Sequence, residues 1–455
     1  MARPLIVLVS LLLTGCFHGH SYAPQRTVTT WREMQRPSQS SASKSPAEAP
    51  MPGQPLTAEQ AYAMALASSP ALAAAEARAE VAEAGIASAR QLDNPQLRLT
   101  NFNVDDVVTN NTGMNIGLRV PIPRPGTIHA KVEGARLGAE GQRGLADDAK
   151  RQLRAQIFKL YARMAMLRAD LEQHTRAGQL RGGQRDELGA RAGLSVATNL
   201  DVALAEVAHI QSLDEAARIE GEMTRVAAEL QRILGAAEPP TLQVDPGELK
   251  LRDLDLDRDT LTERAMTSRP ELRLAQSLVG QAQADVYLAR SEAYPWFDWA
   301  QVQYRAGPNA NASSWGFGVA MTLPVFSLNR GEIKASRALV RQREFEERAQ
   351  IAAVASEVGE AIERVQQTAR RVKDLETKLL PQIETATRAA ETALAAGALD
   401  PVTASTVATR MVEARRTHIT ALLEHREAVI DLETAIGGAI TPPPAPAKPS
   451  PADKP

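Results

Sequence analysis

The same order of motifs occurs twice along this chain, with the second copy about 200 positions after the first. Ala65–Pro70 is matched by Ala265–Pro270, and Ala89–Arg90 is matched by Ala289–Arg290. Later pairs keep the order: Pro121 with Pro324, Gly126 with Gly331, Gly193 with Gly397, and Gly235 with Gly437. Internal repeats decide an architecture before other signals do. We therefore interpret residues 56–236 and 260–438 as two copies of one structural unit, joined by a connector at 237–259.

Each unit contains a helical pattern that is too long for a compact globular core. From Glu332 to about Ala396 only Gly359 and Pro381 interrupt this pattern. Apolar residues recur there every seven positions, at Ile351, Val358, Val365, Val372 and Leu379, with Val354, Ala361 and Leu375 on the neighbouring row. The first unit has a similar seam at Leu153, Ile157, Leu160, Met164, Leu167 and Leu171. Each such helix is on the order of 100 Å long, which favours a tunnel wall over a globule.

The remaining helices of each unit are about half as long. The pattern predicts a helix of roughly 35 residues, a strand hairpin, a helix of roughly 65–70 residues and a second helix of roughly 35. The first helix is expected to begin after Thr57, with Gln60 completing a capping box, and to run to about Leu92. Because two short helices laid end to end match one long helix, the lengths predict a cylinder wall in which long helices alternate with stacked pairs of short ones.

The hairpins are predicted from residues that alternate between apolar and small or polar side chains, as in Trp315–Leu323. Strands are expected at about residues 96–104, 114–122, 298–306 and 314–324, with structural turns at Pro121, Gly126, Pro324 and Gly331. Strands of about 9–10 residues are long enough to cross a bilayer as part of a barrel. Four strands cannot close a barrel, and hydrocarbon does not tolerate an open edge, so several protomers must share one. A trimer would supply twelve strands; the alternative is two hairpins that cap a soluble helical rod.

The N-terminus has the features of an export signal. Arg3 is followed by an apolar run and by Leu13–Cys16, which resembles the bacterial lipobox. We expect residues 1–15 to be a signal peptide and Cys16 to carry a covalent lipid, at the start of a low-complexity tether over 16–55. The alternative is an ordinary signal peptide with a chance cysteine. Cys16 is the only cysteine, so no disulfide framework is available. The Pro- and Ala-rich tail, 439–455, is expected to be disordered.

Composition and motifs argue against several functional classes. The formal net charge is −2 and the basic residues are evenly spread, so we expect no nucleic-acid partner. We find no phosphate-binding loop, nucleophile elbow or metal-spaced His/Cys cluster, and therefore expect neither an enzyme nor a metal site. Apart from the lipid on Cys16, no cofactor is expected.

These duplicated motifs resemble the TolC family of outer-membrane factors. The resemblance rests on Leu56–Pro70 and Ala89–Pro95 in the first unit, and on Arg269–Leu272, Ala289–Pro295 and Leu323–Gly331 in the second; it covers residues 56 to 438. It implies a mainly α fold with a transmembrane β-barrel: a homotrimer with a twelve-stranded barrel and a periplasmic α-helical tunnel. It also implies a lipid-anchored outer-membrane channel that works with a periplasmic adapter and an inner-membrane pump of the RND type.

The resemblance also suggests where the tunnel narrows. In this family acidic residues on the helix–turn–helix ends constrict the periplasmic tip, and Asp201 falls near the family position. The second unit has no acid at the matching place; its nearest is Asp400. For Asp201 a charge favoured by the helix dipole is an equal alternative. We expect passive conduction as part of an efflux pump. A type I secretion duct and a periplasmic coiled-coil adapter or structural lipoprotein are the alternatives, and the sequence leaves the cargo open among drugs, metal cations and polypeptides.

Overall fold

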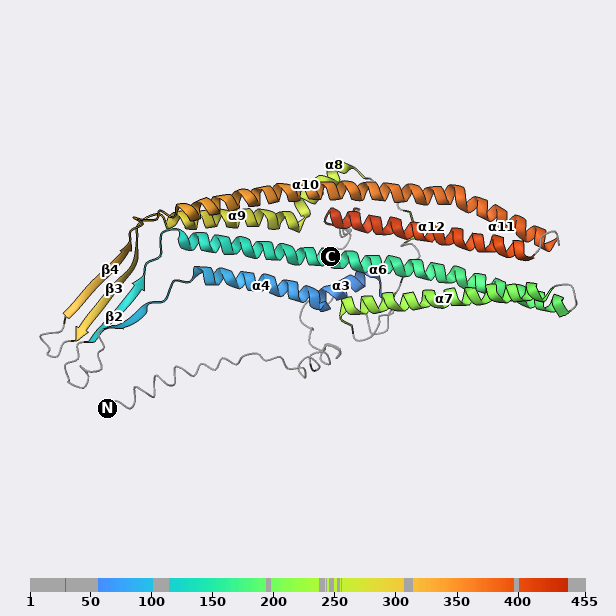
Figure 1. The fold of residues 1–455 in the computed structure, drawn as a ribbon, viewed down its shortest axis with the longest axis horizontal. Helices are drawn as coiled ribbons and strands as arrows, with labels where there is room; N and C mark the ends of the chain where they lie inside the picture. The colour runs from blue at the N-terminus through green and yellow to red at the C-terminus, as the bar shows by residue number, and fades with distance from the viewer. Residues whose placement is uncertain are drawn as a thin grey trace, which may run out of the picture.

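The computed structural model describes residues 56–100, 114–193, 198–236, 256–306, 314–396 and 401–440, together with positions 29, 242, 244, 249–251 and 254. The chain forms an elongated bundle of helices with one small sheet at its end (Figure 1). Within the described residues, no helix combines the length and the apolar character that a membrane span requires.

The two units have the same order of elements, which confirms the predicted duplication. The first consists of α3 (Ala58–Ser68), α4 (Pro70–Arg90), β1 (Gln96–Thr100), β2 (Met114–Pro121), α6 (Thr127–Gly193) and α7 (Asn199–Leu234). The second consists of α8 (Arg258–Ser268), α9 (Pro270–Ser291), β3 (Trp296–Ala306), β4 (Ser314–Thr322), α10 (Arg330–Asp374), the π-helical η3 (Leu375–Leu379), α11 (Leu380–Ala395) and α12 (Pro401–Ala435).

The prediction of a single helix from Thr57 to about Leu92 is wrong, because the helix breaks at Ser69. Ser69 has extended backbone angles and Pro70 occupies the start of α4. A proline disfavours the helical conformation of the residue before it and is well tolerated at a helix start. The second unit breaks in the same way at Arg269 and Pro270.

The two breaks also close the ends of α7 and α12 in equivalent ways. The hydroxyl of Ser68 donates to the carbonyl of Leu234 at 2.7 Å, and the hydroxyl of Ser268 donates to the carbonyl of Ile436 at 2.8 Å. Gly235 and Gly437 follow with φ of 62° and 79°, the left-handed conformation that ends a helix. The repeated motifs are therefore the residues that join each pair of short helices.

The helices form one curved layer in which each long helix lies beside short helices that are stacked end to end in pairs. α6 contacts α4 and α7 on one side and α9 and α12 on the other, and α10 packs on α9 and α12 (Figure 1). α4 with α7 therefore forms one edge of the layer, and α10 with α11 forms the other. This arrangement confirms the alternation of long and paired short helices.

The apolar seams form the contacts between these helices. Leu153, Ile157, Leu160, Met164 and Leu167 of α6 are buried, together with Tyr161, whose hydroxyl donates to the carbonyl of Leu56 at 2.9 Å. On α10 the residues Val354, Val358, Val365 and Val372 are buried. Ile351 is exposed and Leu379 is only partly buried, so the predicted heptad seam covers less of this helix than expected.

The second long helix contains one irregular turn. Leu375–Leu379 is π-helical, and the N–H of Leu380 bonds to the carbonyl of Leu375. Pro381 follows directly; it has no N–H, and its ring would clash with the carbonyl four residues earlier. A single wider turn accommodates the proline without ending the helix. Thus the interruption seen in the sequence at Pro381 is a local π-bulge.

The four strands form a single antiparallel sheet in the order β1-β2-β3-β4. The central pairing, β2 with β3, joins the two units, with Leu118 opposite Val302. The described strands are shorter than or shifted from the expected ranges: β2 ends at Pro121, β3 begins at Trp296 and β4 ends at Thr322. Residues 101–104 of the first expected strand lie outside the described residues.

Candidate functional site

One face of the sheet is apolar and exposed. The cross-strand register places side chains from all four strands on this face. They are Leu97, Leu99, Ile116, Leu118, Val120, Phe297, Val302, Tyr304, Trp315, Phe317, Val319 and Met321. Phe317 is 82% exposed. A contiguous apolar surface of this kind marks a contact with lipid or with another protein.

The opposite face of the sheet is polar. Arg98, Arg119 and Arg305 project from it together with Asn115, Gln301 and Gln303. Arg119 stacks on Trp299, with its guanidinium carbon 3.8 Å from the ring centroid, and its Nε lies 3.4 Å from Oε1 of Gln301. The sheet therefore has the lipid-type and water-type faces that a transmembrane barrel strand requires.

Both edges of the protomer are open. β1 and β4 each have one hydrogen-bonding side without a strand neighbour within the described residues. The β1 edge continues into α4, and the β4 edge leads to α10 (Figure 1). Unpaired strand edges are templates for pairing with another chain.

The α4–α7 edge also carries an apolar stripe that no other described residues cover. Five exposed apolar residues of α7 follow one another at intervals of three and four: Leu200, Leu204, Val207, Ile210 and Leu213. This spacing places them on one side of the helix, as in a coiled-coil seam. The stripe is therefore suited to packing against a further helix.

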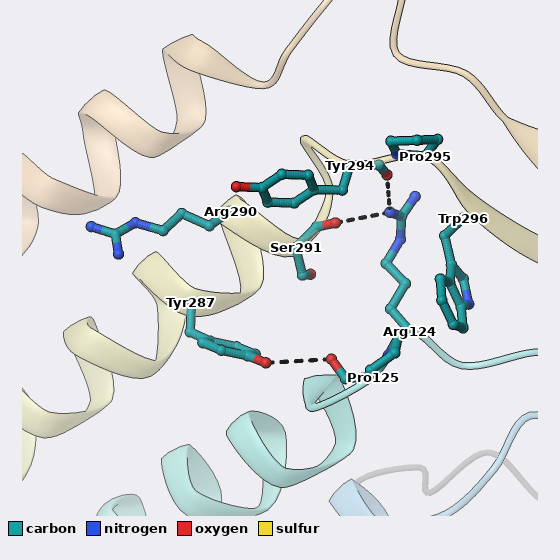
Figure 2. Close-up of a pocket in the computed structure, with 8 residues that line it drawn as sticks. All are labelled: Arg124, Pro125, Tyr287, Arg290, Ser291, Tyr294, Pro295 and Trp296. Atoms are coloured by element: carbon teal, nitrogen blue, oxygen red, sulfur yellow. Dashed lines mark hydrogen bonds between the residues drawn. The ribbon is translucent and has the colours of Figure 1, made fainter.

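A cavity of about 400 Å³ lies where the strands join the helices (Figure 2). Arg124 ties the two units together there, since its Nη1 donates to the carbonyls of Ser291 at 2.8 Å and Tyr294 at 2.6 Å. Trp296 Nε1 donates to the carbonyl of Ile122 at 3.1 Å. The junction is thus fixed by bonds between the first and second units.

The predicted turn residues have different roles in this junction. Pro121 is the last residue of β2, and Pro324 follows the end of β4. Gly126 has a φ of 77°, and a Cβ at this position would collide with the hydroxyl of Tyr287, so the turn requires glycine. These three positions lie where the chain passes between strand and helix.

The prediction that Gly331 forms the turn of the second unit is wrong. Gly331 lies inside α10, and the left-handed conformation belongs to Asn329, with a φ of 51°. Asparagine adopts this conformation more readily than other side chains do. Its amide nitrogen also donates to the carbonyl of Ala289 at 2.9 Å and to Glu292 at 3.1 Å. The side-chain bonds therefore hold the turn that glycine provides in the first unit.

Asp201 lies in the first turn of α7, near the far end of the bundle. Its carboxylate accepts bonds from the N–H of Thr198 at 2.9 Å and from the Thr198 hydroxyl at 2.7 Å. The N–H of Asp201 donates back to Thr198 Oγ1 at 3.2 Å, which completes a capping box. Asp201 thus stabilises the start of the helix whatever else it does. Asp400 and Cys16 lie outside the described residues.

A charged cluster that the sequence did not predict links α6, α7 and α12. Glu215 accepts from Arg218 at 2.6 Å and from Arg416 of α12 at 2.8 Å. Buried Asp170 of α6 lies 3.6 Å from Arg416 and from His174. The hydrogen bond from Arg218 lowers the pKa of Glu215 to about 2, whereas burial raises the pKa of Asp170. Through Arg416, the cluster therefore connects α6 and α7 of the first unit with α12 of the second.

The cluster predicts a pH-dependent contribution to stability. The pKa of Glu215 falls on folding, so its stabilisation is complete above the ordinary value of 4.5 and is lost as the pH drops towards about 2. Glu215→Gln is expected to cost about 1–3 kcal/mol near neutral pH. The difference from the unmodified protein should disappear as the pH falls through this window in thermal unfolding. Glu222→Gln is the matched control, because Glu222 pairs with Arg218 at 2.6 Å within α7 itself. A pH-independent effect of Glu215→Gln would contradict the assignment.

Comparison with known proteins identifies relatives of this architecture. The family model described as outer membrane efflux protein matches residues 61–236 and 261–438. The cobalt-zinc-cadmium resistance protein CzcC of Cupriavidus metallidurans is 23% identical over 288 residues, which span 61% of this chain and 65% of that relative. Its alignment thus reaches just under two thirds of the relative's own length.

Solved structures share the fold at low sequence identity. CusC, whose structures concern transmembrane channel formation, superposes with a TM-score of 0.71 at 16% identity and covers 84% of this chain and 92% of its own. The open-state outer membrane channel MtrE of Neisseria gonorrhoeae gives a TM-score of 0.70 at 16% identity, with 84% and 89% covered. At this identity the likeness shows the fold.

Proposed function

The chain belongs to the outer membrane efflux protein family, and from this membership we propose that it is the outer-membrane channel of a tripartite efflux pump. An inner-membrane pump, of the RND type, and a periplasmic adapter supply energy and substrate, while this chain conducts passively. A type I secretion duct remains the alternative within the same architecture. The periplasmic adapter predicted as a rival does not fit a family of outer-membrane efflux proteins.

The open edges of the protomer are the observation that carries this proposal. A four-stranded sheet with two free edges cannot sit in hydrocarbon, where every backbone polar group needs a partner. If the β1 edge of one copy pairs with the β4 edge of the next, the contact is heterologous and closes only as a ring. Three copies give a barrel of twelve strands, within the size range of bacterial outer-membrane barrels. The homotrimer then completes both the barrel and the helical tunnel.

Two further features support this assembly. The apolar stripe of α7 lies on the edge that would meet α10 and α11 of the next copy. Tyr287, Tyr294 and Trp296 gather where the strands join the helices (Figure 2). Aromatic residues are enriched where membrane barrels meet the headgroup region. We place the inner boundary of the outer membrane at this junction, with the helices in the periplasm and with Cys16 carrying the lipid anchor.

The cargo is proposed only by class. The name of the relative CzcC refers to cobalt, zinc and cadmium, so divalent cations are one candidate beside drugs and polypeptides. Within the part of the chain that the structure describes, no group of three or more His, Cys, Asp or Glu residues could hold a metal ion. We assign the choice among these cargo classes mainly to the pump and adapter.

Purification and reconstitution test the proposal. The lipidated protein extracted in detergent should have the mass of a trimer and should form discrete conductance steps in planar bilayers. A deletion strain should become more susceptible to the compounds that the pump exports, and the intact gene should restore resistance. A stable, water-soluble monomer without pore-forming capacity would end the proposal.

We further propose that Asp201 contributes to the periplasmic constriction. Asp201→Ala removes both the charge and the N3 half of the capping box, whose N-cap residue is Thr198. Asp201→Asn removes the charge and keeps an oxygen that can accept from Thr198. Both variants should raise single-channel conductance if the carboxylates narrow the pore. Unchanged conductance in Asp201→Asn would remove Asp201 from the gate.

A further inference from the structure

All the basic residues of the described strands lie on one face of the sheet. The strands contain three arginines and no lysine. Gln96 pairs with Arg119, Arg98 with Gly117, and Asn115 with Arg305, and these pairs share the polar face. The opposite, apolar face carries no charge. The arginines therefore form a set, defined here as the arginine face: Arg98, Arg119 and Arg305.

Two arginines of this face, Arg119 and Arg305, are held in place by neutral partners. Trp299 and Gln301 position Arg119, and Arg305 Nε donates to Asn115 Oδ1 at 3.3 Å. Gln301 in turn donates to Gln303 at 3.1 Å. None of the ion pairs among the described residues involves an arginine of this face. The charge of the arginine face is therefore not compensated by an ion pair among the described residues.

Carboxylates are nearly absent from these strands. Asp298 is the single acid within the described strands, and it lies in the bulge between Phe297 and Trp299, at the helix end of the sheet. Its carboxylate accepts a hydrogen bond from the hydroxyl of Thr322. It therefore does not neutralise the arginine face farther along the strands.

Folding alone does not account for this arrangement. Arg98 and Arg119 are diagonal neighbours on adjacent strands, a spacing of about 7–8 Å between backbone positions, and like charges at close range destabilise a sheet. Glutamine would supply the same hydrogen bonds to Gln301 or Asn115 without repulsion. The positive charge of the arginine face is thus better explained by the solutes that pass along this face than by a contribution to the stability of the sheet.

We propose that the strand-lined segment of the channel selects for anions, an inference that rests on the proposed trimeric channel. Three copies would line the pore with nine guanidinium groups. A water-filled passage with a low-dielectric wall and charge of one sign concentrates ions of the opposite sign. Anionic solutes are the favoured class in this segment, and a free divalent cation has to be driven past it by the pump.

Reversal potentials across planar bilayers measure this selectivity directly. Because a carboxylate ring at Asp201 would favour cations, the measurement uses the Asp201→Asn background, whose trimer in a KCl gradient should pass Cl⁻ more readily than K⁺. The triple variant Arg98→Gln, Arg119→Gln, Arg305→Gln should lower the Cl⁻/K⁺ permeability ratio by about tenfold, the low end of the enrichment expected from a charged cleft. The shift should shrink when the mean salt concentration is raised from about 0.1 M to about 1 M, because screening shortens the range of the charges.

Thr100→Ser is the matched control, since it alters the same face without changing charge. It should leave the permeability ratio unchanged in the same Asp201→Asn background. A K⁺-selective pore in the Asp201→Asn background, or a ratio that the triple variant does not move, overturns the inference while leaving the channel function intact. Absence of any conductance overturns the proposed function and this inference with it.

Discussion

Replacing Phe317 with arginine is expected to remove most of the assembled channel from the outer membrane. Phe317 is 82% exposed, stands opposite Val302, and lies between Trp315 and Val319 on the apolar face. An arginine that faces lipid near the middle of a bilayer costs about 2–4 kcal/mol. Every copy of a trimer incurs this cost, so the loss should be large. The amount of trimer in isolated outer membranes, seen on gels without heating, measures it.

The opposite face of the same strand pair supplies the control. Gln303 lies on the polar face opposite Gly316, so Gln303→Arg would place the same charge in the aqueous pore. This variant should assemble nearly as well as the unmodified protein. If Phe317→Arg assembles equally well, or if both variants fail alike, the assignment of the apolar face to lipid is wrong.

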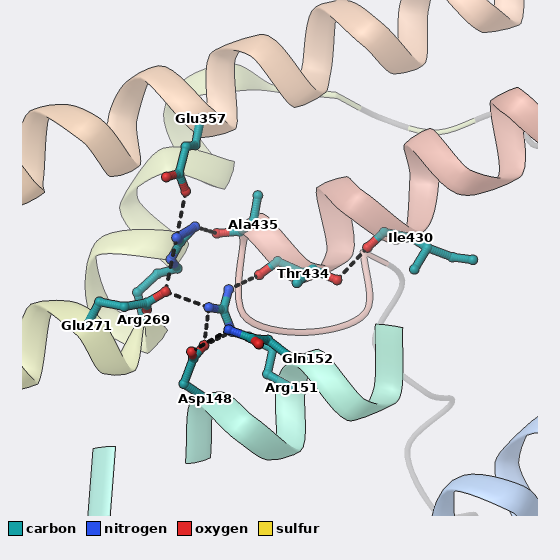
Figure 3. A network of polar contacts seen from close by, with 9 residues as sticks. All are labelled: Asp148, Arg151, Gln152, Arg269, Glu271, Glu357, Ile430, Thr434 and Ala435. Atoms are coloured by element: carbon teal, nitrogen blue, oxygen red, sulfur yellow. Dashed lines mark hydrogen bonds and ion pairs between the residues drawn. The ribbon is translucent and has the colours of Figure 1, made fainter. Parts of the chain in front are cut away.

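Replacing Arg269 with methionine is expected to destabilise the folded chain by about 3–5 kcal/mol, as breaking a buried ion pair does. Only 5% of the Arg269 side chain is exposed. Its guanidinium contacts Glu357 at 2.6 Å, Glu271 at 3.2 Å and the carbonyl of Ala435 at 3.2 Å (Figure 3). Because Glu357 is half exposed, most of the penalty should come from Glu271 and the Ala435 carbonyl.

The same network extends to the first unit. Arg151 of α6 donates to Glu271 at 2.6 Å and to the carbonyl of Thr434 at 2.5 Å (Figure 3). Arg269 and Arg151 therefore hold the end of α12 against the break between α8 and α9. Loss of one arginine leaves Glu271 with fewer partners in a partly buried place, which explains why the effect should exceed that of a surface pair.

Arg273 provides the matched control on α9. Its side chain is about half exposed, and its guanidinium lies 3.5 Å from Asp147. Arg273→Met should cost at most about 1 kcal/mol, as expected for a surface pair. Thermal unfolding of both variants in detergent gives the comparison. Equal shifts in the melting temperature would show that the network around Arg269 does not stabilise the fold as described.

The long helices could be predicted from sequence because their signal is local. The seam from Leu153 to Leu167 depends only on spacing along one helix, and the structure buries these residues as predicted. The sequence does not predict the break at Ser69, because the helical pattern continues on both sides of Pro70. The sequence likewise shows an interruption at Pro381, but it does not show that one wider turn lets the helix continue past this proline.

Only the apolar face of the candidate site could be predicted from the sequence. Alternation in Trp315–Met321 identifies an apolar face within a single strand. The arginine face depends on cross-strand register, and above all on the pairing of β2 with β3, whose residues are almost 200 positions apart. Neither the link through Arg416 nor the network around Arg269 has a sequence signal, because each joins helices from different parts of the chain.

Cross-linking between the sheet edges tests the closure of the ring most directly. Thr100 of β1 and Ser314 of β4 lie at one level of the polar face, since Thr100 pairs with Asn115, Asn115 with Arg305 and Arg305 with Ser314. A chain with both Thr100→Cys and Ser314→Cys is treated in cells with a flexible bis-maleimide. We expect covalent dimers and trimers, and nothing larger, from this double variant. Each single variant should give monomers alone. Monomers alone from the double variant, or dimers from a single variant, would contradict a three-copy ring closed between β1 and β4.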